Sequence, residues 1–261
     1  MTASGSSTWR FIDTGLRSGA ENMAIDEALL SCFDPEQSLP LLRLYGWSPA
    51  AFSYGRFQNP AETVSLEKCH AAGVQVVRRI TGGGLLYHGK ELTYSLVCPA
   101  GFIPGAPGVK EAFFRLTAFL IAFYRSLGLA AVHAADYYAG AKQLGGRSAL
   151  CFAGTESCDI LINGRKIGGN AQRRVKNTIF QHGSIPMQQL AAESQQYLLA
   201  AAPQIVTGTT ALADEGVAAG RDALAALLAA SFSAVFGVAL QTASLTGEEQ
   251  ECAAEYMQKT A

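Results

Sequence analysis

The chain alternates between stretches with a two-residue hydrophobic period and stretches with a helical one. Strand-like runs occupy residues 9–13, 41–47, 51–54, 74–77, 91–97 and 130–134. The clearest is 91–97, where Leu92, Tyr94 and Leu96 alternate with a second set of side chains. A sheet of several strands is therefore expected, and neighbouring strands in the sequence often follow one another without a helix between them.

Apolar residues at positions i, i+3, i+4 and i+7 predict the helices. The first follows Ser18 as a capping residue and ends before Asp34-Pro35. Further helices are predicted over residues 64–72, 110–127, 189–200, 222–236 and from 247 onward. Because strands and helices do not alternate strictly, the pattern predicts an α+β fold with mixed sheets flanked by helices. Residues 1–261 show no repeat or long linker, so we expect a single domain without a C-terminal accessory domain.

Composition, net charge and cysteine spacing argue against several classes of function. Hydrophobic residues make up 49% and charged residues 16% of the 261 positions, enough for a sizeable core. The net charge of −1 gives no general affinity for nucleic acid, and no apolar run approaches the ~18 residues of a membrane span. The N-terminus lacks the pattern of a secretory signal. Six scattered cysteines without a CxxC pair argue against a metal site and a disulfide framework, which fits a reducing cytoplasm.

Three consecutive glycines stand between two strand-like runs. The segment reads Arg78-Arg79-Ile80-Thr81-Gly82-Gly83-Gly84-Leu85-Leu86-Tyr87-His88. Such glycines permit positive φ and expose backbone N–H donors, and two arginines precede them, so the segment suits an anion-binding loop. It is neither a P-loop nor a dinucleotide-binding fingerprint. A flexible hairpin is the simpler alternative.

A second candidate site lies between Cys151 and Ser184. The run 159–162, the turn Asn163-Gly164 and the return Arg165-Lys166-Ile167 predict a hairpin. Lys166 then leads into Gly168 and Gly169, where a ligand can approach bare backbone. Taken alone, this stretch is better explained by an ordinary hairpin with a solvated lysine; the rest of the chain changes that balance.

Several segments together resemble the lipoate/octanoate attachment enzymes, that is, the lipoate-protein ligases and octanoyltransferases, which are related in fold to biotin-protein ligase and the class II aminoacyl-tRNA synthetases. The matching segments are Asn22 to Ala28, Gly55-Arg56-Phe57-Gln58-Asn59, Arg78 to His88, Lys166 to Ala171 and Gln181-His182-Gly183. They span roughly residues 9 to 200 in order, which is far more specific than one glycine motif. The resemblance implies an acyl chain beside the glycine loop. It also implies substrate-binding roles for Arg78, Arg79, Thr81, Gly82, Gly83, Gly84, Tyr87, His88, Gly168, Gly169, Ala171 and His182.

Two chemistries divide this family. The octanoyltransferases of Gram-positive bacteria pass octanoyl from acyl carrier protein to an enzyme cysteine and then to a carrier lysine, without ATP. Their cysteine is followed by Phe, as in Ser148-Ala149-Leu150-Cys151-Phe152, and Glu91-Leu92-Thr93-Tyr94-Ser95 also resembles them. This favours Cys151 as nucleophile, with Lys166 stabilising the thiolate and the oxyanion. The implied acceptors are lipoyl domains, of glycine cleavage H protein or of 2-oxoacid dehydrogenase acyltransferase subunits.

The alternative is a ligase that activates free lipoate with ATP and Mg. The triple glycine is more ligase-like, and the segment from Ala153 to Cys158 departs from the transferase pattern. In a ligase, Arg78, the glycines and Asn59 would surround the adenylate phosphate, Lys166 would neutralise it, and Cys151 would be incidental. A non-catalytic acyl-binding protein is a third possibility. His182 is a candidate proton carrier or orients the Lys166 loop, and His88 closes the site structurally.

Overall fold

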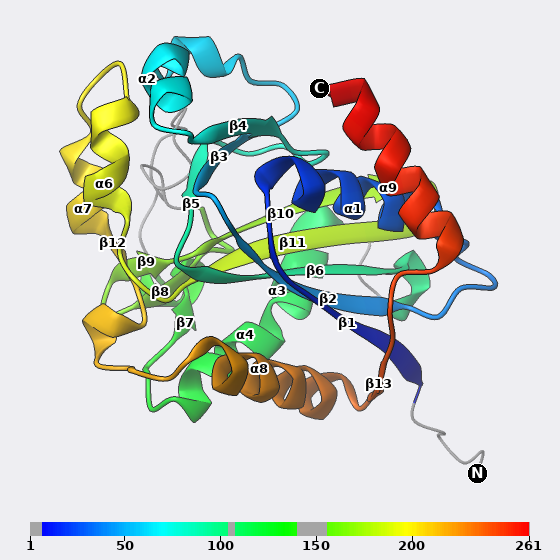
Figure 1. Cartoon of the computed structure of the whole chain (residues 1–261). Coiled ribbons are helices and arrows are strands. Elements are labelled where there is room, and N and C mark those ends of the chain that lie inside the picture. Colours follow the sequence, from blue (N-terminus) through cyan, green and yellow to red (C-terminus); the bar gives the residue numbers. More distant parts are fainter. Residues whose placement is uncertain (1–6, 104–107, 140–155, 261) are drawn as a thin grey trace.

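The computed structural model describes residues 7–103, 108–139 and 156–260. Its largest sheet has the order β10-β11-β6-β2-β1-β13 (Figure 1). These strands are β1 (Thr8–Arg17), β2 (Leu41–Trp47), β6 (Glu91–Pro99), β10 (Gly169–Val175), β11 (Thr178–Pro186) and β13 (Ala239–Thr242). β1 runs parallel to both β2 and β13, whereas the other neighbours are antiparallel, so the sheet is mixed.

Two smaller sheets carry the segments singled out by the sequence. The first has the order β4-β3-β5 and the second β12-β9-β8-β7. Their strands are β3 (Ala51–Tyr54), β4 (Gln75–Arg78), β5 (Leu86–His88), β7 (Val132–His133), β8 (Ile160–Ile162), β9 (Arg165–Ile167) and β12 (Thr209–Thr210). The glycine loop joins β4 to β5, and Lys166 is the central residue of β9.

Gly168 connects the sheet of Lys166 to the main sheet. It is the residue between β9 and β10, and its φ of 69° lies in the left-handed region that favours glycine. A Cβ here would clash with the backbone carbonyl of Ser184 on β11. Glycine is therefore required sterically as well as conformationally where the chain crosses between the sheets.

Helices cover both faces of the main sheet (Figure 1). They are α1 (Gly19–Ser31), α2 (Leu66–Ala71), α3 (Val109–Leu116), α4 (Ala118–Ser126), α5 (Ala134–Tyr137), α6 (Ala191–Ser194), α7 (Pro203–Gly208), α8 (Arg221–Phe236) and α9 (Gly247–Thr260). Leu42 packs in one core with Phe119 of α4 and Phe232 of α8. Leu41, its neighbour on β2, packs in the other core with Ile25 of α1. The period-two alternation of a strand thus divides its side chains between two cores.

Helix α1 begins as its sequence predicts. Ser18 accepts the backbone N–H of Glu21, and the Glu21 carboxylate accepts the N–H of Ser18, which forms a capping box. The helix then buries Asn22 and Asp26, two polar side chains, against the sheet. Buried polar groups need partners, and those of Asp26 include residues of the candidate site.

Several elements differ from the prediction. The helix expected over 110–127 is broken into α3 and α4 at Thr117, whose hydroxyl bonds the Phe113 carbonyl and the ring of His133. The helix expected over 189–200 is only the short α6, followed by a single 3-10 turn. β13 was not predicted, because its exposed, polar sequence shows no alternation. The mixed sheets with helices on both faces confirm the α+β class. In the parts of the chain that the structure describes, no helix has the length and apolar character needed to traverse a bilayer.

Candidate functional site

A pocket lies between the glycine loop and the start of β10. Six of the residues predicted to bind substrate line it: Arg79, Gly83, His88, Gly169, Ala171 and His182. The other lining residues come mainly from β2, β5, β6 and β11 and are Met23, Tyr45, Trp47, Leu86, Thr93, Asn170, Gly183 and Ser184. Segments 90 residues apart therefore meet as the resemblance implies, around a cavity whose walls are largely apolar.

His182 connects this pocket to the interior of the protein. Its Nε2 lies 2.8 Å from Oγ1 of Thr81, and its Nδ1 lies 3.3 Å from Oδ2 of Asp26. Burial lowers the pKa of His182, although Asp26 opposes the shift. The neutral ring donates from Nδ1 to the carboxylate and accepts the Thr81 hydroxyl proton at Nε2. His182 thus holds the residue that precedes the glycines, rather than the loop of Lys166.

Asp26 is held as a carboxylate by several donors. Its oxygens accept Nη1 of Arg43 at 2.7 Å, the hydroxyl of Ser95 at 2.8 Å and that of Tyr45 at 2.9 Å. Burial acts to raise the pKa of Asp26, but the charge of Arg43 and the contacts of His182 and Ser95 together outweigh it, so the pKa lies below its ordinary value. Asp26 carries no distinctive local spacing, although it stands inside the matching segment from Asn22 to Ala28.

His88 also lines the pocket and has a similar arrangement of partners. Its Nε2 is 2.6 Å from Oγ of Ser53, and its Nδ1 is 2.9 Å from Oε1 of Glu91. The Trp47 indole stacks on the imidazole with ring centroids 3.9 Å apart. Thr93 donates to the same carboxylate oxygen at 2.6 Å. All these groups are buried, so His88 is fixed from both ends and from one face.

Arg79 was predicted to bind substrate, but its guanidinium is engaged by the protein itself. Nη1 donates to the carbonyl and hydroxyl of Ser53 at 2.6 and 2.8 Å. Nη2 donates to the carbonyls of Gly82 and Gly84 at 3.2 and 2.7 Å. Arg78, in contrast, is exposed and donates to the Arg56 carbonyl at the surface.

The glycine loop is also packed against the segment that contains Gly55. Gly83 has a φ of 95° and is exposed, and a Cβ added at Gly55 would clash with its carbonyl oxygen. The backbone N–H of Arg56 donates to the Thr81 carbonyl at 2.9 Å. Two separate matching segments therefore form one loop assembly, and the absence of a side chain at Gly55 permits their close approach.

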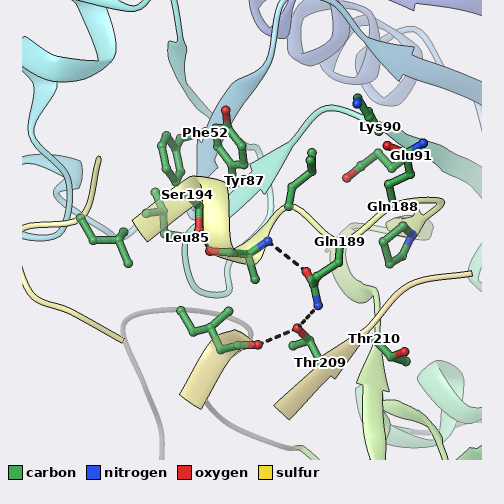
Figure 2. A pocket seen from close by; sticks show the side chains of 15 residues that line it. Phe52, Leu85, Tyr87, Lys90, Glu91, Gln188, Gln189, Ser194, Thr209 and Thr210 are labelled. Carbon is green, nitrogen blue, oxygen red and sulfur yellow. Dashed lines mark hydrogen bonds between the residues drawn. The ribbon is translucent and has the colours of Figure 1, made fainter. Parts of the chain in front are cut away.

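Tyr87, also predicted to bind substrate, lines a different pocket (Figure 2). Its ring packs against Phe52 with centroids 4.7 Å apart, and its hydroxyl donates to Glu193 at 2.7 Å. On the other side of this second pocket, Gln189 donates to Thr209 at 2.8 Å. Tyr87 and His88 are neighbours on β5, and their side chains face opposite ways into two different pockets.

Lys166 is buried and forms an ion pair. Its Nζ lies 2.7 Å from Oδ2 of Asp159, which also accepts the backbone N–H of Glu156 at 2.7 Å. On β9 it lies opposite Leu161 on one neighbouring strand and Thr209 on the other. The residues that line the glycine-loop pocket do not include Lys166, which lies three residues before Gly169. The solvated lysine of an ordinary hairpin is therefore excluded.

Cys151 lies outside the described residues. Cys158, the nearby second thiol, is half-buried in the turn before β8. Burial raises the pKa of the Cys158 thiol, which disfavours the thiolate needed for nucleophilic attack. Among residues 7–103, 108–139 and 156–260, no group of three or more His, Cys, Asp or Glu side chains is arranged to hold a metal ion.

Comparisons with known proteins agree with this architecture. Residues 18–233 match the lipoyl protein ligase A/B catalytic domain family. Octanoyltransferase LipM of Kyrpidia tusciae is 34% identical over 263 residues, covering 97% of this chain and 96% of its own. The LipM of Bacillus subtilis is 39% identical over 180 residues, which cover 68% of this chain but 65% of the relative's length.

Solved structures share the fold. A lipoate-protein ligase A bound with ATP superposes with a TM-score of 0.79 at 21% identity, covering 98% of this chain and 95% of that one. The bipartite lipoate protein ligase of Thermoplasma acidophilum gives a TM-score of 0.77 at 21% identity, covering 97% and 92%. At this identity the likeness concerns the fold alone. Together with the family match over 18–233, it confirms the resemblance drawn from the motifs: the chain belongs to the lipoyl protein ligase A/B catalytic domain family.

Proposed function

We propose that the protein transfers an octanoyl group from acyl carrier protein to a lysine of a lipoyl domain. The observation that carries this proposal is the alignment with an octanoyltransferase over 97% of the chain. The acceptors are glycine cleavage H protein or the acyltransferase subunits of 2-oxoacid dehydrogenases. A Thermoplasma acidophilum neighbour of the same fold is described together with a lipoyl domain. We place the reaction in the cytoplasm, because scattered free cysteines suit a reducing compartment.

The largely apolar glycine-loop pocket is suited to an octanoyl chain. Met23, Tyr45, Trp47 and Leu86 supply hydrocarbon and aromatic surface. Burying an eight-carbon chain is favourable by roughly 0.8 kcal/mol per methylene group. The histidines at its wall use both ring nitrogens in internal hydrogen bonds, so their polar atoms are already engaged within the protein.

In the proposed reaction, the Cys151 thiolate attacks the thioester carbonyl of the octanoyl donor. The new bond joins Cys151 Sγ to the acyl carbon, and the carrier thiolate leaves and takes up a proton. The lysine amine of the lipoyl domain then attacks the enzyme thioester. An amide forms, Cys151 leaves as thiolate, and the amine releases a proton. No ATP is consumed, because a thioester is already activated toward an amine.

We assign to Lys166 the stabilisation of negative charge in these steps. Its position supports the assignment: β9 joins the edge of the pocket through Gly168, and Gly169 lies in the pocket wall. Asp159 pairs with the Lys166 ammonium and restricts its conformations inside the protein. A preorganised cation in a partly dry site stabilises an oxyanion more than a solvated one does.

The test is intact-mass spectrometry of the protein mixed with octanoyl-acyl carrier protein, without ATP. The expected result is the addition of one octanoyl group, removable by hydroxylamine. The same mixture with a lipoyl domain should then transfer the mass to that domain. Acylation of the domain only from free acid with ATP and Mg, with release of pyrophosphate, would instead identify a lipoate-protein ligase. Acyl binding without transfer under either condition would identify a binding protein.

A further inference from the structure

The glycine loop is held by a chain of buried side chains that reaches Glu91. Glu91 bonds His88, His88 bonds Ser53, Ser53 bonds Arg79, and Arg79 bonds the carbonyls of the glycine loop. We propose that Ser53 and Glu91 are positioning residues, which fix His88 and Arg79 and thereby set the backbone of Gly82 to Gly84. Neither residue was assigned a role from the sequence or from the resemblance.

The members of this chain lie within hydrogen-bond distance of one another. A guanidinium has no acceptor, so Arg79 must donate to Oγ of Ser53. The same Oγ lies 2.6 Å from Nε2 of His88, and Nδ1 of His88 lies 2.9 Å from Oε1 of Glu91. Removing Ser53 or Glu91 therefore breaks the connection between this buried network and the glycine loop.

The consequence for the loop lies in its carbonyl groups. Arg79 draws the carbonyls of Gly82 and Gly84 toward the interior through Nη2. Gly83, between them, has a φ of 95° and lies in the pocket wall. A loop of three glycines has more conformational freedom to lose than any other sequence, so side-chain restraints are needed to hold one conformation.

The second histidine holds the same loop at its other end. His182 bonds the hydroxyl of Thr81, immediately before the glycines, and its own Nδ1 bonds Asp26. Both arrangements have the order hydroxyl, imidazole, carboxylate, and both imidazoles line the pocket. The proposal concerns Ser53 and Glu91, whose removal should release one end of the loop while the His182 contact holds the other.

The experiment compares Ser53→Ala and Glu91→Ala with matched controls in the full chain. Ser231→Ala removes a buried hydroxyl on α8 that bonds a backbone carbonyl, and Glu249→Ala removes a buried, ion-paired carboxylate on α9. In protein labelled with 15N-glycine, the amide signals of Gly82, Gly83 and Gly84 should shift or broaden in the two test variants and not in the controls. Signals of the remote Gly216 and Gly237 should stay unchanged in the test variants.

Activity provides a second measurement, which rests on the proposed octanoyl transfer. Each test variant should lose roughly tenfold or more in kcat/KM, and the double variant no more than about the worse single one, since both act through Arg79 and His88. Glu91→Gln, whose amide oxygen can still accept from His88, should retain more activity than Glu91→Ala. Unchanged glycine-loop signals in a folded test variant would overturn the assignment. If no octanoyl transfer is detected even in the wild type, the proposed function fails, while the glycine signals still decide the positioning role. Should Ser53→Ala not fold, the Glu91 variants decide the outcome.

Discussion

Lys166 and Asp159 form a buried ion pair, with Nζ 2.7 Å from Oδ2. The two residues belong to the hairpin around Asn163-Gly164, one just before β8 and the other in β9. The turn has positive φ at both Asn163 and Gly164, which suits a tight two-residue connection. The hairpin therefore brings a carboxylate to the lysine from only seven positions away, and removing Lys166 leaves that buried carboxylate without its ion-pair partner.

Lys166→Ala should lower both the rate of transfer and the free energy of unfolding, and the two effects can be measured separately. Loss of one oxyanion-stabilising group commonly costs ~2.7–4 kcal/mol in the transition state, or about a hundred- to thousandfold in rate. The unpaired Asp159 should also lower the free energy of unfolding, by about 3 kcal/mol. Adding Asp159→Ala should recover part of that stability, as measured by urea unfolding, without restoring transfer. Near-normal carrier acylation by Lys166→Ala would exclude a role for the lysine.

Gly55→Ala should disturb the pocket although residue 55 does not line it. The added Cβ meets the carbonyl of Gly83, so the glycine loop must move. Gly83→Val should act more directly, because a β-branched residue resists a φ of 95°. We expect a loss of roughly tenfold or more in transfer for each. Gly101→Ala, where a Cβ meets no atom within 4 Å, is the control and should behave as wild type.

Stability should fall as the solution becomes mildly acidic, in part through His182. Its pKa is lowered by burial, so below about pH 6.5 the unfolded chain binds a proton that the native ring does not. The free energy of unfolding should therefore decrease as the pH falls through this range. Urea titrations at about pH 7.5 and 5.5 should show a smaller decrease in His182→Gln. A residual decrease is expected, because burial also lowers the pKa of His133.

Cys151→Ser decides between the two chemistries. A serine hydroxyl is barely ionised at neutral pH, so transfer from octanoyl-acyl carrier protein should drop to background and no thioester should form. Cys158→Ser is the matched control and should remain active, since burial raises the pKa of that thiol. Activity of Cys151→Ser with free acid and ATP would identify a ligase. An inactive Cys158→Ser beside an active Cys151→Ser, without ATP, would make Cys158 the nucleophile.

Several strands were predictable because alternation and turn residues define them, but β10 and β11 of the main sheet were not predicted. The bounds of β2 and β3 agree with the sequence pattern, and α8 agrees to within one residue. Thr117 interrupts an otherwise continuous amphipathic run through a contact with His133, which no local pattern reveals. β13 forms because β1 offers an edge for parallel pairing, not because its own sequence favours a strand.

The sequence predicted which residues lie at the candidate site better than it predicted what each of them does. The motifs placed Arg79 and His182 at the pocket, whereas the contacts that occupy their side chains depend on tertiary structure. Ser53 and Asp26 were missed because a buried hydroxyl or carboxylate carries no distinctive local spacing. Asp26 and Glu91 do stand inside segments that resemble the family, which is the one signal the sequence offered for them.

The crossing of the chain at Gly168, from the sheet of Lys166 to the main sheet, also restricts insertions and deletions near this residue. β10 is paired with β11 from Gly169↔Ser184 onward, and β11 with β6 as far as Pro186↔Glu91. Inserting or deleting one residue between Lys166 and Gly169 would shift this register by one, and every side chain on β10 would change faces. Ala171 would leave the pocket while Lys166 stayed with Asp159. Strand pairing thus fixes the three-residue spacing from Lys166 to Gly169 in the pocket wall. Insertions and deletions should not occur between these two residues, even where substitutions are tolerated.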